Sequence, residues 1–414
     1  MKKKPNVIFF APILEYPPKG GPQLSVINAI KVLSKITNLY IVTSVNKDML
    51  DSISKEFLDK HSSKCIFSSS SKIFTKKLMS WKHSRKFKRL LNPISCLVDA
   101  LSIIKISKKE KIEIIWIDRV IEHAFFLFFY IKIFSYKKKV IADTETVYSD
   151  FILRELPFIN NKLRFFYIFL RGKFAQLQEK IMLKNADVIT SVSELDQNHY
   201  QLHTKVKSKV RLFSNVVDLE DYTKKENSKI QIEKPYLILM GSFGNKNSPM
   251  DRAAKWLVED IMPIVWKKIP SVNLCIVGRN SNLTQSHLKS SRVHVLGKVP
   301  YMLPYLKNAS ASLVPLVYES GTRFKIIESG AASIPCISTS LGAEGLDVTD
   351  GKNIIIANKT LDFAEAIIKI LKDDKLALNM SKELHNLIKL KYSLSKQTKE
   401  GQDIIDFVIG ESHE

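Results

Sequence analysis

Short apolar runs alternate with amphipathic stretches along the whole chain. The runs are rich in Ile, Val and Phe and end at Gly, Pro, Ser or Asp, which is typical of strands buried on both faces. The amphipathic stretches repeat apolar residues every three or four positions and predict helices. We predict strands at residues 7–11, 39–43, 65–67, 112–118, 139–143, 188–192, 210–213, 236–240, 273–277, 293–296, 311–315, 335–338 and 353–356. We predict the main helices at residues 24–36, 125–134, 162–183, 251–265, 361–371, 376–390 and 393–408.

Strands that alternate with helices indicate an α/β fold with parallel sheets. The alternation restarts once, after a polar and charged stretch at residues 224–234 that we interpret as an interdomain connection. A chain of 414 residues has room for two domains, each with its own core. We therefore expect one doubly wound domain over residues 1–223 and a second over residues 235–393.

The stretch from Val314 to Gly330 carries the clearest candidate chemistry. An apolar strand leads into the turn Ser320-Gly321-Thr322 and then into a helix that starts near Arg323. A helix N-terminus offers free N–H groups and a favourable dipole to an anion. Arg323 and Lys325 are unfavourable there in an isolated helix, so an anionic ligand is expected opposite them, and Glu328 can accept hydrogen bonds from sugar hydroxyls. Phosphates and a sugar diol together describe a nucleotide; the alternative is one of the many strand–turn–helix units that bind nothing.

This segment resembles the donor-binding signature of retaining glycosyltransferases of family 4, which have the GT-B fold of two doubly wound Rossmann-like domains facing across a cleft. A variant of that signature reads Gly-x-Gly-x-Arg-x-Lys-x-x-Glu, and residues 320–328 read Ser-Gly-Thr-Arg-Phe-Lys-Ile-Ile-Glu. Glu328 matches the second glutamate of the family, whereas Ser320 occupies the first position, with Glu319 beside it. The resemblance is most specific over residues 236–358, and it implies that residues 394–414 form a helix packing back on the first domain.

The resemblance also implies roles for individual residues. Arg323 and Lys325 would stabilise the leaving diphosphate, Glu328 would hold the ribose, and the loop around Val299 would hold the nucleobase. The donor-binding set that follows is Gly20, Gly21, Gly241, Ser242, Lys246, Val299, Ser320, Gly321, Thr322 and Glu328. No Asp-x-Asp pair of the metal-carrying type occurs, so we predict neither a metal nor another cofactor.

Two carboxylates, Asp143 and Glu145, follow the strand at residues 139–143. Carboxylates at the carboxyl end of a parallel strand face the crevice in which such sheets bind ligands. We therefore group them with Arg323 and Lys325 as candidate catalytic residues that orient an acceptor hydroxyl or the donor sugar. A helix N-cap and a first-turn acid are the alternative interpretation.

The positive charge is concentrated in the first half of the chain, with 38 Lys and Arg against 18 Asp and Glu up to residue 215, and 26 against 23 after it. The stretch from Lys72 to Arg89 has eight basic residues, no acidic residue and several aromatic side chains. This pattern favours a segment lying on an anionic membrane surface. A solvated helix with its apolar stripe on the domain is an alternative, and nucleic acid is disfavoured because no binding motif is present.

The four cysteines are widely spaced, which indicates reduced thiols and a cytoplasmic protein. We see no signal peptide, and the apolar run at residues 125–134 is too short to span a bilayer. We predict a glycosyltransferase that moves a sugar from a nucleotide-sugar to a hydroxyl of a lipid-linked or polysaccharide acceptor, in bacterial surface polysaccharide or lipopolysaccharide synthesis at the inner membrane face. The alternatives are a nucleotide-sugar epimerase or phosphorylase on the same fold and a non-catalytic binding or scaffold protein.

Overall fold

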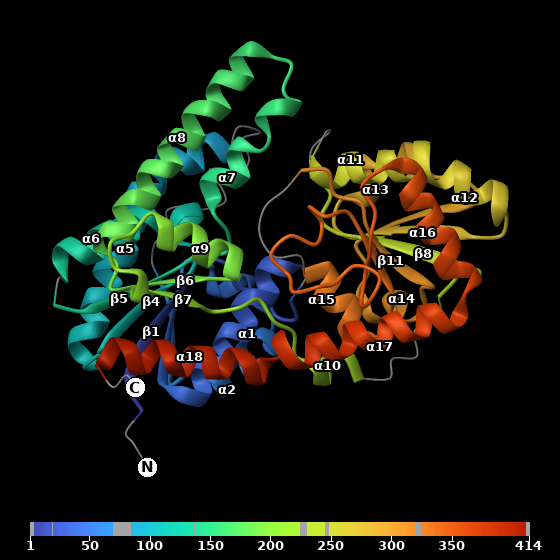
Figure 1. The fold of residues 1–414 in the computed structure, drawn as a ribbon. Coiled ribbons are helices and arrows are strands. Elements are labelled where there is room, and N and C mark those ends of the chain that lie inside the picture. The colour runs from blue at the N-terminus through green and yellow to red at the C-terminus, as the bar shows by residue number, and fades with distance from the viewer. Residues whose placement is uncertain are drawn as a thin grey trace. The chain divides into compact units, whose positions relative to one another are not determined.

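The computed structural model describes residues 4–18, 20–68, 84–135, 137–223, 230–244, 248–318 and 324–410, with all their side chains except those of residues 49 and 84–91. The chain forms two compact units (Figure 1). Residues 1–214 and 397–414 make the first unit, and residues 215–396 make the second.

The first unit is built on a parallel sheet with strand order β3-β2-β1-β4-β5-β6-β7. Its strands are β1 Asn6–Ala11, β2 Asn38–Thr43, β3 Lys64–Phe67, β4 Ile114–Ile117, β5 Lys139–Asp143, β6 Val188–Ser191 and β7 Val210–Leu212. Its α-helices are α1 Gly21–Ile36, α2 Ser52–His61, α5 Ser84–Lys109, α6 Phe125–Phe134, α7 Tyr148–Leu153, α8 Lys162–Asn185, α9 Glu194–Leu202 and α18 Leu394–Ile409. A π-helical turn at Val120–Ala124 and short 3₁₀ turns at Lys47–Met49, Leu156–Phe158 and Lys207–Lys209 complete it.

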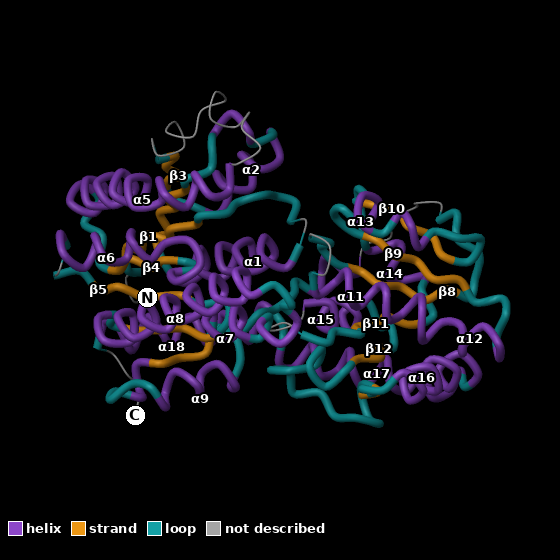
Figure 2. Tube along the Cα trace, turned by 90° about the horizontal axis from the view of Figure 1, so that it is seen from above, coloured by secondary structure: helices purple, strands orange, loops and turns teal. Residues whose placement is uncertain are grey.

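The central strands of this sheet are apolar on both faces because helices cover both (Figure 2). Ile8 and Ile115 point into a core cluster that includes Ala100 of α5, Phe128 of α6 and Met182 of α8. The last helix, α18, joins the unit through polar contacts as well. Its Gln397 donates a hydrogen bond to the Ser214 carbonyl at 2.9 Å, and its Glu400 accepts from the backbone and side chain of Ser214.

The second unit repeats the plan with strand order β10-β9-β8-β11-β12-β13, again parallel throughout. Its strands are β8 Tyr236–Met240, β9 Asn273–Val277, β10 Val293–Gly297, β11 Ala311–Val314, β12 Cys336–Ser338 and β13 Ile355–Ile356. Its helices are α10 Leu219–Thr223, α11 Pro249–Lys255, α12 Met262–Lys268, α13 Ser281–Thr284, α14 Leu303–Asn308, α15 Phe324–Ala331, α16 Thr360–Lys372 and α17 Asp374–Lys391, with a π-helical turn at Trp256–Ile261 and a 3₁₀ turn at Ser286–Leu288.

The division between the units falls between Ser214 and Asn215, earlier than the expected limit at residue 223. Val217 donates a backbone hydrogen bond to the Tyr392 carbonyl at 3.0 Å, which ties the start of the second unit to its end. Ile232, inside the stretch interpreted as a connection, is buried in a core cluster of the second unit. Because these contacts join residues 217 and 232 to parts of the second unit far away in the sequence, the boundary between the units lies before them.

Both sheets have the strand order of dinucleotide-binding domains, in which ligands bind beyond the carboxyl ends of the strands where the order reverses. In the first unit this point lies between β1 and β4, and in the second between β8 and β11. The residues that follow these four strands are therefore the first place to look for a functional site.

Candidate functional site

In the second unit, the carboxyl ends of β8, β9 and β10 are joined through glycine backbone. Gly241 donates a hydrogen bond to the Val277 carbonyl at 3.1 Å, and Gly278 donates to the Gly297 carbonyl at 2.8 Å. Gly278 has φ +134°, and a Cβ there would lie 1.8 Å from the Gly241 oxygen. Only glycine fits that position. Glycine at these positions therefore lets the strand ends pack closely against one another and against neighbouring side chains.

Lys325 reaches this glycine edge from α15. A Cβ added to Gly241 would lie 3.3 Å from Cε of Lys325 and 2.8 Å from Cε of Met250. Gly241 and Lys325 were predicted from two separate motifs, and in the structure they lie next to each other. Arg279 donates a hydrogen bond from Nε to the Ser242 hydroxyl at 3.2 Å and is otherwise exposed. Arg279 was not predicted, although its place directly after β9 and Gly278 puts it at the same edge.

Glu328 lies one turn beyond Lys325 on α15. The hydroxyl of Tyr222, on α10, donates to its Oε1 at 3.2 Å. Burial raises the pKa of Glu328 to about 7, although the Tyr222 hydroxyl and the Lys325 charge act in the opposite direction. Tyr222 was missed by the sequence interpretation, since nothing in its surroundings marks it as the partner of a residue so far along the chain.

Val299 follows β10 in a loop and is partly exposed. It packs against the same apolar cluster as Tyr222, a cluster that includes Tyr236 and Leu306. Through Tyr222, the predicted residues Glu328 and Val299 thus adjoin one apolar cluster. Five further predicted residues lie outside the described residues: Lys246, Ser320, Gly321, Thr322 and Arg323.

In the first unit, Asp143 ends β5 and is 6% exposed. Its two oxygens accept hydrogen bonds from Nε1 of Trp116 at 2.9 Å and from the Thr190 hydroxyl at 2.5 Å. Burial raises the pKa of Asp143 to about 6 against these two hydrogen bonds. The Asp143 carboxylate therefore links β4, β5 and β6. Both of its oxygens are engaged in hydrogen bonds within the sheet.

Glu145 is held by Arg119, a buried residue that the sequence interpretation missed. Arg119 directly follows the Asp118 that ends the β4 segment and has left-handed backbone, with φ 54°. Its Nη2 lies 2.8 Å from Oε1 of Glu145 and donates to the Pro22 carbonyl at 3.3 Å. Pro22 is the second residue of α1, directly after Gly21, so one guanidinium links the predicted Gly20-Gly21 loop to the predicted Glu145.

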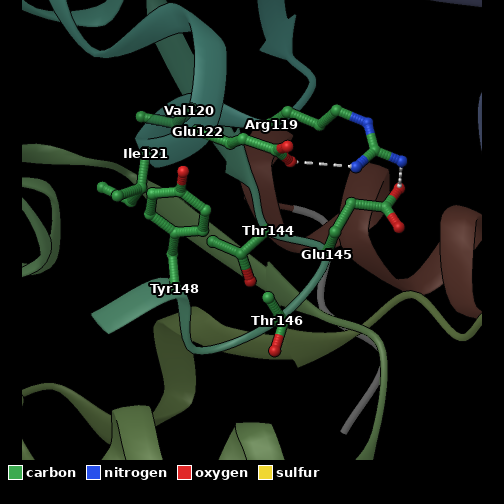
Figure 3. Close-up of a pocket in the computed structure, with 8 residues that line it drawn as sticks. All are labelled: Arg119, Val120, Ile121, Glu122, Thr144, Glu145, Thr146 and Tyr148. Atoms are coloured by element: carbon green, nitrogen blue, oxygen red, sulfur yellow. Dashed lines mark hydrogen bonds and ion pairs between the residues drawn. The ribbon is translucent and has the colours of Figure 1, made fainter. Parts of the chain in front are cut away.

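Two more carboxylates lie close to the same guanidinium, and Figure 3 shows one of them, Glu122. Oε2 of Glu122 lies 3.2 Å from Nη1 of Arg119, and Oδ2 of Asp118 lies 3.5 Å from its Nε. Burial works against the charge of Arg119, but the carboxylates outweigh it and hold its pKa above the usual range. Burial raises the pKa of Asp118 well above its usual range. Burial also acts to raise the pKa of Glu122, yet His123 and Arg119 together lower it to about 2.

A small hollow of about 10 Å³ lies against this charged network (Figure 3). It is lined by Arg119, Val120, Ile121, Glu122, Thr144, Glu145, Thr146 and Tyr148. The hollow has room for about one water molecule or one hydroxyl group, and the carboxylate, hydroxyl and guanidinium groups on its walls can donate and accept hydrogen bonds there. Among the described residues, no group of three or more His, Cys, Asp or Glu side chains is placed to hold a metal ion.

The segment that forms the second unit's site matches a known family of enzymes. Residues 234–373 match the family model described as Glycosyl transferases group 1. A curated relative, described as an uncharacterised 44.6 kDa protein in the cps region of Klebsiella pneumoniae, is 24% identical over 127 residues, or 28% of this chain. The match spans 33% of that relative's length.

Solved structures share the fold along nearly the whole chain. A glycosyltransferase from Rickettsia africae aligns over 99% of this chain and 100% of its own, with 16% identity and a TM-score of 0.69. Anabaena HepE, solved with UDP-glucose, aligns over 98% and 99%, with 10% identity and a TM-score of 0.66. A Listeria monocytogenes structure described as a UDP-N-acetylglucosamine 2-epimerase aligns over 99% and 98%, with 12% identity and a TM-score of 0.58.

These likenesses confirm the predicted fold class, two Rossmann-like domains with GT-B neighbours. Together with the family model, they support a glycosyltransferase. Within the described ranges, no helix combines the length and apolar character needed to cross a bilayer.

Proposed function

We propose that the protein transfers a sugar from a nucleoside-diphosphate sugar to a hydroxyl of an acceptor, with retention of the anomeric configuration. The observation that carries this proposal is the position of Gly241, Lys325 and Glu328. Lys325 lies beside Gly241, Glu328 follows one turn later on the same helix, and all three fall inside the segment that matches the glycosyltransferase family. The second unit would accordingly bind the donor.

The donor end of the reaction needs positive charge and close backbone. When the bond between the sugar's C1 and the diphosphate oxygen breaks, the diphosphate leaves with the electron pair and its negative charge grows. Lys325 and Arg279 reach the glycine edge and would stabilise that charge, and Arg323 joins them by resemblance. Glu328 would accept hydrogen bonds from the ribose hydroxyls. No metal is required in this proposal.

The acceptor would bind at the first unit, beside Glu145 and Arg119. Its hydroxyl oxygen forms the new bond to C1 and gives up its proton, either to the leaving diphosphate or to a carboxylate at this edge. The cps-region relative supports an acceptor in bacterial surface polysaccharide synthesis, lipid-linked or polymeric. We place the protein in the cytoplasm, on the inner membrane face. The proposed membrane segment, Lys72–Arg89, lies outside the described side chains.

A thermal-shift screen with UDP, GDP, ADP, CMP and their sugar conjugates tests the donor site. A nucleotide at a hundredfold excess over its Kd stabilises the folded chain by about 2.7 kcal/mol. We expect such a shift with one diphosphate, its loss in Glu328→Ala and Lys325→Gln, and its retention in the controls Glu365→Gln and Lys369→Gln, which alter exposed positions of α16. Binding unaffected by either site variant would contradict the proposed site.

A nucleotide-sugar epimerase is the second candidate, because the Listeria structure shares the fold. Incubation of the donor sugar without any acceptor separates the two activities. An isomerised sugar in that reaction favours the epimerase. Absence of binding to every nucleotide, with or without acceptor, favours a non-catalytic binding protein.

A further inference from the structure

Helix α8 exposes an apolar stripe along most of its length. Six large side chains recur at intervals of three and four residues on the side away from its packed face: Leu163, Phe166, Tyr167, Leu170, Phe174 and Leu177. They are between 48% and 83% exposed. Six side chains of about 200 Å² each, roughly half exposed, present on the order of 600 Å² of apolar surface, at the upper end of what a monomer usually shows.

The opposite face of α8 packs against the rest of the first unit, and these contacts fix the rotation of the helix about its axis. Gly172 lies so close to α7 that a Cβ there would meet the Leu153 side chain at 2.3 Å. Buried Glu179 accepts hydrogen bonds from the backbone and hydroxyl of Ser149 at 2.9 and 2.6 Å. Figure 1 shows the N-terminal part of α8 extending away from the sheet of the first unit. The stripe is therefore the outer face of an anchored helix.

Basic side chains flank the stripe on both sides. Lys162, Lys173 and Lys180 follow one edge and are exposed, and Arg164 and Arg171 follow the other. The Arg171 guanidinium lies 5.9 Å from the centre of the Tyr167 ring. The single acidic residue of α8, Glu179, is buried on the packed face. An apolar and aromatic stripe between two basic edges is the pattern of a helix lying in a membrane interface.

The exposed leucines of the second unit, unlike the apolar side chains of α8, do not form a continuous stripe. Leu361, Leu378 and Leu390 are 63% to 72% exposed on α16 and α17, but they are far apart in the sequence and have polar neighbours. No other described helix exposes as many large apolar side chains as α8. Isolated exposed leucines are normal on a soluble surface, whereas a continuous stripe indicates a binding partner.

We propose that the outer face of α8 docks on the surface of an anionic lipid bilayer, with the stripe at the level of the acyl chains and the flanking Lys and Arg at the headgroups. The charge of the helix favours this partner over a second copy of the chain, since two such faces would bring the basic edges together. The residues of this docking surface differ from those of the Lys72–Arg89 segment, and the proposal does not depend on glycosyl transfer.

Vesicle sedimentation of the full chain without any nucleotide tests the proposal. We expect retention on vesicles of phosphatidylcholine with a third phosphatidylglycerol, and weaker retention on phosphatidylcholine alone or at high salt. The variant F166E/L170E/F174E is expected to lose at least tenfold in vesicle affinity. The matched control L361E/L378E/L390E, also at exposed positions, is expected to bind as the wild type does. Both variants should keep the wild-type melting temperature, because the changed side chains face solvent.

A tryptophan reporter locates the contact directly. Phe166→Trp should show blue-shifted emission and quenching by brominated lipid on anionic vesicles, after subtraction of the wild-type signal. Leu378→Trp should show neither. Unchanged vesicle binding by the α8 glutamate variant, or unshifted emission from the Phe166→Trp variant on bound vesicles, would overturn the proposal. So would a wild-type dimer in solution that the glutamate variant converts to a monomer, since a second copy would then cover the stripe.

Discussion

The two units present their strand ends in opposite ways. In the second unit the strand ends are joined by backbone contacts of Gly241, Gly278 and Gly297, and the Lys325 side chain packs beside Gly241. In the first unit the corresponding edge is filled by charge, with the Arg119 guanidinium held among carboxylates that include Glu145. One edge is shaped by close backbone packing at glycine and the other by buried ion pairs, although both sheets have the same strand order.

The difference fits two kinds of ligand. A diphosphate is recognised by backbone N–H groups and cations, and close approach to backbone requires glycine. A hydroxylated acceptor needs hydrogen-bonding side chains that keep their positions, and ion pairs fix the carboxylates that would do this. Substitution of one central residue at each edge, Arg119 in the first unit and Gly278 in the second, tests this contrast.

Removing Arg119 should have the largest effect. Arg119→Leu leaves neighbouring carboxylates buried without their counter-charge, and we expect a loss of about 3 to 5 kcal/mol in the free energy of unfolding. Urea denaturation at neutral pH measures it. Arg164→Leu removes an exposed guanidinium that pairs with Glu155 and should lose at most about 1 kcal/mol. Equal effects of the two substitutions would show that the charged network contributes no more than a surface pair.

Gly278→Ala should have the next largest effect. The new Cβ meets the Gly241 carbonyl and forces a backbone angle that only glycine adopts readily, so we expect about 3 kcal/mol of destabilisation. Gly351→Ala is the control, because Gly351 also has positive φ, at 73°, but has open space around it. It should lose about 1 kcal/mol. Thermal denaturation compares them, and similar losses would mean that the glycine edge tolerates side chains.

Glu328→Gln should change the pH dependence of stability. Because the folded-state pKa of Glu328 is raised to about 7, its contribution to stability is full below the unfolded-state pKa and declines as the pH rises through about 7. The glutamine variant lacks this decline, so it should become more stable than the wild type by about 2 kcal/mol at pH 8. Denaturation curves at pH 5 and pH 8 measure the difference. Parallel pH profiles of the two proteins would contradict the raised pKa.

Gly20→Ala should have the smallest effect on stability. Gly20 has extended backbone, and the nearest atoms to a Cβ there would be the flexible end of Gln23, at 3.3 Å, and Cδ of Pro22, at 3.9 Å. We expect a change of less than about 0.5 kcal/mol. If donor binding nevertheless becomes weaker, the absence of a side chain at Gly20 is needed for the donor to bind. If neither stability nor binding changes, its assignment to the donor site is wrong.

Strands and long helices were well predicted from the sequence. The strand at residues 273–277 and the helix at residues 125–134 have the predicted limits, because strands buried on both faces form apolar runs with sharp ends. The interpretation missed that α5 spans Ser84–Lys109, since its basic start and its internal Pro93 obscure the helical pattern. The unit boundary was placed too late because Tyr222 and Ile232 belong to the second unit through contacts with distant residues.

The roles proposed for the site residues stay predictions, but their positions can be compared with the structure. Gly241, Lys325 and Glu328 were identified by motif and lie together, whereas their partners Tyr222 and Arg279 were not identified. Hydrogen bonds between residues far apart in the sequence, such as that from Tyr222 to Glu328, leave no local pattern. Arg119 could have been found, because Asp118-Arg119 ends an apolar strand as Asp143 does, at the edge where ligands bind.

The affinity for the nucleotide identified in the screen, measured by calorimetry from pH 6 to pH 8, tests the central claim most directly. An ionised Glu328 accepts hydrogen bonds from ribose hydroxyls and a protonated one accepts them less well, so the wild-type affinity should rise as the pH passes about 7. Glu328→Gln should bind about tenfold more weakly at pH 8, with no such rise, and Glu365→Gln should follow the wild type. Equal affinity and equal pH dependence in wild type and Glu328→Gln would contradict the donor site described above.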